Sequence, residues 1–109
     1  MNLRAASFQG PLLRAAITFA AAADNVAVAA VAGQTIRVYA LSITLASGTL
    51  TIKDGAGGTA LTGAMTRTTW DVPMNPSLDP HFVMTAGNAF IMATSGAVQL
   101  SGYVLYTQD

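Results

Sequence analysis

The segment "QTIRVYALSITLA", Gln34 to Ala46, is the longest alternation of apolar residues in the chain. Apolar residues first fall at even positions, Ile36, Val38 and Ala40, and then at odd positions, Leu41, Ile43 and Leu45, so the phase slips by one near Ala40-Leu41. Successive side chains of a strand point to opposite faces, so this slip of one residue would turn half of the set outward. We therefore expect a bulge or bend near Ala40 that keeps both halves on one face, as where a long strand crosses a sandwich corner.

Shorter apolar alternations separated by turn residues lie on both sides of this segment. They occupy positions 13–19, 26–30, 50–52, 61–65, 69–74, 81–84, 89–93 and 98–106. Turn signals at intervals of about 8–12 residues are typical of an antiparallel β-sandwich or barrel. We predict an all-β fold of about eight strands, with residues 13–109 as a single sandwich domain and residues 1–12 as an extended N-terminal arm.

The first part of the domain allows a second interpretation. Residues 13–32 are rich in alanine, which favours a helix. The pair Asp24-Asn25 reads as a turn that would break such a helix, and β-branched residues such as Ile17 and Val26 favour strands. Strands are therefore the preferred prediction for this region, with one alanine-rich helix as the alternative.

The composition predicts a protein that associates with other subunits. Only 9% of the 109 residues are charged, against roughly 25% in an average soluble domain, and glutamate is absent. Hydrophobic residues make up 52%. The formal net charge of zero gives no electrostatic reason for binding nucleic acid or an anionic membrane. We expect a homo-oligomer with cyclic symmetry whose subunits cover much of the weakly charged surface.

Two C-terminal segments are apolar on both of their alternating faces. Near the end of the chain, Tyr103 and Leu105 point away from the face of Val104. In the preceding apolar run, Phe90 and Met92 oppose Ile91. A sheet covered on one side should be polar on the other. We therefore predict a subunit interface formed by Phe90, Met92, Tyr103 and Leu105.

The glycine-rich stretch "KDGAGGT", Lys53 to Thr59, invites comparison with ligand-binding loops. Its lysine precedes the glycines, and the chain continues as a strand, so neither the spacing nor the helix of a phosphate-binding loop is present. Asp54 and Thr59 alone are too few oxygen ligands for calcium. Glycine readily adopts the positive φ angles of tight turns. We predict a β-hairpin here, with no bound metal or cofactor.

No constellation of side chains predicts catalysis. The chain has no cysteine, and His81 is its single histidine, next to Pro80 at a strand start. A general base or a metal ligand needs close partners, and no serine lies in a nucleophile-elbow motif. Trp70 and the tyrosines could stack on a sugar, but aromatic residues on strands more often pack in a core or an interface. We expect a protein that is not an enzyme.

The N-terminal arm is the expected contact with a partner. Its Gly10-Pro11 pair interrupts any regular period. Such an arm frays unless a neighbouring molecule holds it. We predict that the contact residues are Leu3, Arg4, Phe8 and Leu12. Arg14 and Asp24 interrupt every apolar window long enough for a transmembrane helix, so no membrane partner is expected.

The segment from Ala30 to Met65, "AVAGQTIRVYALSITLASGTLTIKDGAGGTALTGAM", resembles small virion-associated proteins encoded among the structural genes of tailed phages. Members of this type resemble jelly-roll proteins, some of which decorate or cement capsids as trimers. The residues that carry the resemblance are Ala32-Gly33, Ile36-Arg37-Val38, Ile52-Lys53-Asp54-Gly55, Leu61-Thr62-Gly63, Met65, Pro73 and Pro76.

The resemblance implies a jelly-roll-like fold and a structural role in a bacteriophage virion. The expected function is a capsid decoration or cement protein, a homotrimer assembled in the host cytoplasm that binds the major capsid protein on the outer head surface. A receptor- or glycan-binding module of a tail fibre, or a subunit of the tail or baseplate, remains the alternative.

Overall fold

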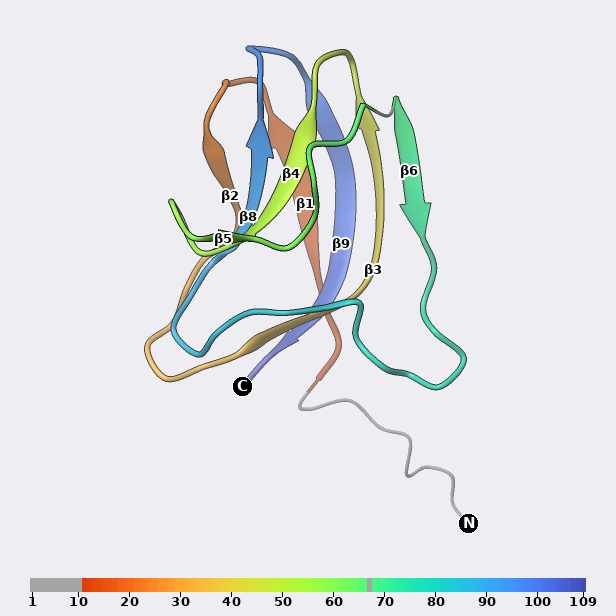
Figure 1. Cartoon of the computed structure of the whole chain (residues 1–109). Helices are drawn as coiled ribbons and strands as arrows, with labels where there is room; N and C mark the ends of the chain where they lie inside the picture. The colour runs from red at the N-terminus through yellow and green to blue at the C-terminus, as the bar shows by residue number, and fades with distance from the viewer. Residues whose placement is uncertain (1–10, 67) are drawn as a thin grey trace.

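The computed structural model describes residues 11–66 and 68–109. These residues form nine strands and no helix, arranged as two antiparallel sheets that pack face to face (Figure 1). The all-β prediction is confirmed, and the alanine-rich helix is excluded because residues 13–32 supply two strands. The strands are β1 (Leu13–Phe19), β2 (Asp24–Val28), β3 (Ile36–Leu45), β4 (Leu50–Asp54), β5 (Thr59–Ala60), β6 (Thr69–Val72), β7 (Phe82–Val83), β8 (Phe90–Thr94) and β9 (Leu100–Gln108).

The two sheets are built from nested strand pairs. The five-stranded sheet has the order β1-β9-β3-β6, and the short β7 also pairs with β3. The four-stranded sheet has the order β2-β8-β4-β5. Strands β1 and β9 therefore pair in one sheet, and the next strands inward along the chain, β2 and β8, pair in the other. Strands β1 to β4 alternate between the two sheets, and so do β7 to β9, so that the apolar faces enclose a common core.

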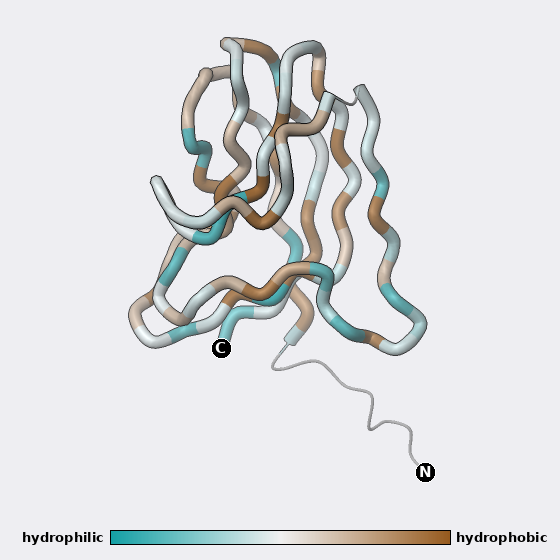
Figure 2. The backbone as a smooth tube through the Cα atoms, viewed as in Figure 1, coloured by the Kyte–Doolittle hydropathy of each residue, from teal (hydrophilic) through white to brown (hydrophobic). Residues whose placement is uncertain are grey.

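Strand β3 contains the irregularity that its sequence predicts. Its pairing with β9 shifts register between Val38 and Ala40. The extra residue, Tyr39, restores the phase, so that apolar residues on both sides of it enter the same core. Figure 2 shows hydrophobic and hydrophilic residues alternating along the strands at the right of the view, where Figure 1 labels β3 and β6. The bulge prediction is confirmed.

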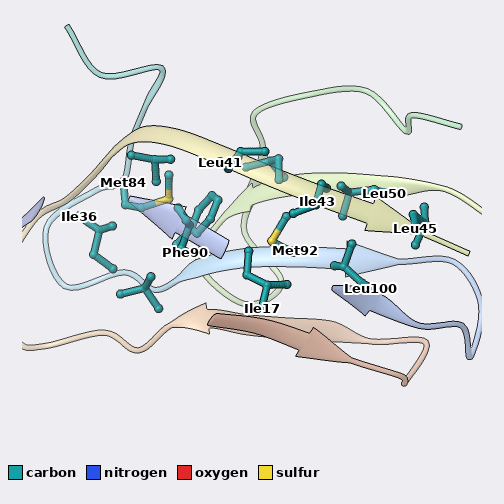
Figure 3. Packing of buried hydrophobic residues seen from close by; sticks show 14 residues of the cluster. Ile17, Ile36, Leu41, Ile43, Leu45, Leu50, Met84, Phe90, Met92 and Leu100 are labelled. Carbon is teal, nitrogen blue, oxygen red and sulfur yellow. The ribbon is translucent and has the colours of Figure 1, made fainter. Parts of the chain in front are cut away.

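The core lies between the sheets and takes side chains from both. Figure 3 shows Ile17 of β1 and Leu100 of β9 close to Met92 of β8, which enters the core from the opposite sheet. Phe90 of β8 lies between the sheets and stacks against the ring of Phe82, with centroids 6.4 Å apart. Complete burial of such side chains is worth about 1.5–3 kcal/mol each. This core fixes the relative position of the two outer faces.

The beginning of β2 differs from the sequence prediction. The pair Asp24-Asn25 was expected as a turn, but both residues belong to β2, and the bend lies at residues 21–23. The buried side chain of Asn25 donates to Thr94 Oγ1 and to the carbonyl oxygen of Ala21, both at 3.3 Å. A buried amide needs such partners. Ala21 lies in the connection after β1 and Thr94 lies in β8, so Asn25 links these two segments. Asp24 is thereby positioned on the outer face of the four-stranded sheet.

Candidate interaction surfaces

The glycine-rich tip of the β4–β5 hairpin folds across the outer face of the four-stranded sheet. The hairpin itself is as predicted, with Lys53 opposite Ala60. Its tip does not project from the end of the sandwich. The backbone N–H of Gly57 donates to Asp24 Oδ2 at 2.7 Å, and Lys53 Nζ lies 3.0 Å from Asp24 Oδ1. Since β8 separates β4 from β2, the tip spans β8 to make this contact (Figure 1).

The folded tip accounts for the burial of Ile91 on the outer side of β8. Ile91 pairs with Val26 of β2 and with Lys53 of β4, yet it is fully buried and lies outside the central core cluster. An apolar side chain on an outer face becomes buried only when something covers it. Here the hairpin tip and the ion pair between Lys53 and Asp24 lie on that face. The four-stranded sheet is therefore partly covered by its own loop.

The carboxylate of Asp24 is electrostatically stabilised in its charged form. The hydrogen bond from the Gly57 N–H lowers the pKa of Asp24 below its ordinary value, and the Lys53 ammonium lowers it further, against a smaller opposing effect of burial. Sequence reasoning did not find this residue, because Asp24 and Gly57 lie far apart in the chain. The single signal was the rarity of charged residues, which makes each one a candidate for a specific contact.

Asp54 organises the neighbouring turn at residues 85–88. Its carboxylate accepts hydrogen bonds from the N–H of Thr85 at 2.9 Å, from the Thr85 hydroxyl at 2.6 Å and from Asn88 Nδ2 at 3.1 Å. Partial burial raises the pKa of Asp54, but the hydrogen bonds from Thr85 and Asn88 outweigh that effect and hold it below the ordinary value. Through these hydrogen bonds, Asp54 links the glycine-rich turn that follows it to the turn at residues 85–88.

A shallow depression of about 340 Å³ lies beside the ion pair. Its lining includes Asp24 and Lys53 together with the small polar residues Thr49, Thr51 and Ser95. The Ser95 hydroxyl already accepts the N–H of Thr49 at 2.8 Å. Small-molecule sites are mostly enclosed and lined by apolar or aromatic side chains. This surface is open, and its apolar lining is limited to the small side chains of Ala22, Ala23 and Ala93.

The outer face of the five-stranded sheet carries two of the predicted interface residues. Tyr103 and Leu105 both lie half-buried there on β9. The guanidinium of Arg14 on β1 lies over the Tyr103 ring, 4.4 Å from its centroid. On the same face, the Ser42 hydroxyl donates to the Asp71 carboxylate. This face is a mixture of polar and apolar groups and keeps Tyr103 and Leu105 accessible.

The other two predicted interface residues have a different location. Phe90 and Met92 have no exposed surface and belong to the central core (Figure 3). The expectation that they contact another subunit is wrong, because the inner face of β8 packs against the opposite sheet. The two faces of β8 alternate as predicted, but Phe90 and Met92 form the inward face. Ile91 is the residue of this run that points outward, and the hairpin tip covers it.

Of the four predicted arm contacts, one lies among the described residues. Leu3, Arg4 and Phe8 lie outside the described residues. Leu12 lies within them, immediately before β1, and 38% of its surface is exposed. Leu13, the first residue of β1, is exposed to the same degree. The junction between the arm and the sandwich therefore presents two adjacent leucines to solvent.

The remaining candidates for chemistry have structural partners. The ring of His81 contacts the Pro73 carbonyl oxygen through Nε2 at 2.8 Å. Trp70 packs against the core and meets Phe82 edge to face, with centroids 6.4 Å apart. Its ring is therefore partly occupied by contacts within the protein. Within residues 11–66 and 68–109, no three histidine, aspartate or glutamate side chains gather as they would around a metal ion.

Comparisons with known proteins add no relative. No family model, curated protein or solved structure matches the chain. In the part of the chain that the structure describes, no helix is long and apolar enough to cross a membrane.

Proposed function

We propose that this chain is a non-enzymatic structural protein of a bacteriophage virion, which binds the outer surface of the head as an oligomer and stabilises it. The observation that carries the proposal is the nested order of the strands. Strand β1 pairs with β9, β2 with β8, β3 with β6 and β4 with β5. This is the pairing of one long antiparallel hairpin that has been folded over to form two sheets. Apart from the short β7, this order resembles that of a jelly roll, an eight-stranded fold that occurs in viral capsid proteins, and the resemblance supports the proposal.

The surface supports a role in binding proteins. Within the described residues, the carboxylates of Asp24 and Asp54 are engaged by other parts of the same chain. Arg37 and Asp109 form another internal ion pair at 2.8 Å. These contacts pair charges within the chain and leave weakly charged faces, such as the outer face of the five-stranded sheet with Ser42, Tyr103 and Leu105. Such faces suit contact with several protein subunits at once, where repeated weak contacts add up to firm attachment.

The proposed partner is the major capsid protein, contacted through the arm of residues 1–12. The test is to mix the purified chain with heads that lack it and to image the particles by cryo-electron microscopy. We expect density on the outer head surface for the full chain and none for a variant that begins at Leu13. Circular dichroism should show the same β-sheet spectrum for both. Full occupancy by the shortened variant would remove the arm from the proposal.

The same images decide between the head and the other locations. Density confined to the tail or baseplate would replace the cement role with that of a tail subunit. Density at a fibre tip, together with binding on a glycan array, would replace it with receptor recognition. The partial burial of Trp70 does not favour the second outcome.

A further inference from the structure

Strand β1 is an open edge of the five-stranded sheet. Within residues 11–66 and 68–109 it pairs with β9 alone, which leaves its other backbone edge without a strand. It is seven residues long and contains neither proline nor a bulge. Proteins commonly protect long edges with charges, prolines, bulges or shortening, because an open edge is a template for another strand.

The other edges of the sandwich show these protections. Strand β6 has four residues, carries Asp71 and is followed directly by Pro73. Strand β2 has an irregular register between Val26 and Val28, and β5 has only two residues. The one charge on β1, Arg14, lies over the Tyr103 ring of its own sheet. Among the described strands, β1 is therefore the edge best suited to pair with another chain.

The sequence of β1, Leu-Arg-Ala-Ala-Ile-Thr-Phe, is complementary to itself in antiparallel register. With Ala16 opposite Ala16 of a second copy, Arg14 lies opposite Thr18 and no like charges meet directly. The inward-facing residues pair only with inward-facing ones, so Leu13 meets Phe19 and Ala15 meets Ile17. The small side chain of Ala16 at the centre lets the outer faces of the two sheets meet without a clash.

We propose that two copies of this chain pair through β1, joining their five-stranded sheets into one continuous sheet across a twofold axis. Such a contact is isologous, so it closes at two copies. The exposed Leu12 and Leu13 lie at its two ends, where they gain cover from the partner. The proposal deepens the self-association in the proposed function by naming its surface. It replaces the trimer implied by the phage-protein resemblance with a pair.

The central contact can be tested by charge at residue 16, which is exposed in the single chain. Sedimentation analysis of the full chain should give twice the 11.2 kDa mass. Ala16→Lys and Ala16→Asp should each weaken the dimer about tenfold or more, because like charges then face each other across the axis. A mixture of the two variants should restore a dimer. The matched control is Thr69→Lys, which places the same charge on the protected edge β6 and should leave the mass unchanged.

A covalent test uses the absence of native cysteine. Directly opposed residues of antiparallel strands have Cβ atoms about 4.5–5.5 Å apart, close enough to link by a disulfide after a small adjustment. Ala16→Cys should therefore give a cross-linked dimer under mild oxidation, and Thr69→Cys should not. A monomer or a trimer in the unmodified chain, or a dimer unaffected by Ala16→Lys, would overturn the proposal. A dimer that fails to bind heads would leave the β1 contact standing and overturn the head-binding function.

Discussion

Replacing Phe90 by alanine separates a core role from an interface role for the inner face of β8. Phe90 is fully buried and stacks on Phe82. Truncation of a buried phenylalanine costs about 3–5 kcal/mol, through lost apolar burial and the cavity that remains. An unfolding entropy of about 2.1 cal/mol/K per residue gives about 0.23 kcal/mol/K for 109 residues. A loss of about 4 kcal/mol should then lower the Tm by about 17 °C.

The assay is thermal and urea unfolding followed by circular dichroism, with sedimentation to measure the oligomer mass. Leu105→Ala is the matched control, because Leu105 is half-buried on the outer face of β9. It should cost about 1 kcal/mol, in line with its smaller loss of burial. The reasoning would be refuted if Phe90→Ala kept the Tm within about 3 °C and changed the oligomer mass instead. That result would return Phe90 to the subunit interface.

Two further predictions concern the hairpin tip. Gly58→Ala should cost about 1–3 kcal/mol in urea unfolding, because its Cβ would lie 2.0 Å from the Asp54 carbonyl oxygen. Gly63→Ala has open space and should stay within about 0.5 kcal/mol, and equal effects would contradict the packed tip. The folded pKa of Asp24 is lowered, so its contribution is present above the unfolded pKa of about 3.9 and is lost as the pH falls through the folded pKa. Asp24→Asn should therefore lose less stability than the unmodified chain on acidification below about pH 4, and identical acid profiles would contradict the Asp24 contact.

Local pattern was sufficient for the strands and for two of their irregular features. The phase slip predicted a bulge near Ala40, and the register of β3 shifts at the adjacent Tyr39. Val38 and Leu41 are three positions apart, and only an even spacing keeps two residues of a regular strand on one face, so one extra residue is needed. The glycines after Asp54 predicted the hairpin, because Gly55 and Gly57 have the positive φ angles that tight turns require. Both features depend on residues that are neighbours in the chain.

Pattern failed where the two faces of a strand were equally apolar. Phe90, Ile91 and Met92 carry no polar residue to mark the outer side, so alternation alone cannot say which set enters the core. The tertiary structure decides, because β8 lies between β2 and β4 with its Phe90 side against the opposite sheet. The interface prediction at Phe90 and Met92 was wrong for this reason.

The sequence by itself determined that the chain is all-β and where most of its strands lie, since these follow from side-chain periodicity and glycine geometry between near neighbours. It placed the turn before β2 wrongly, at Asp24-Asn25. Only the tertiary structure decided that the glycine-rich tip folds back to Asp24 and buries Ile91. It also decided that β1 is left as an open edge. Contacts between residues distant in the chain depend on how the sheets are ordered and packed, and no local pattern encodes that order.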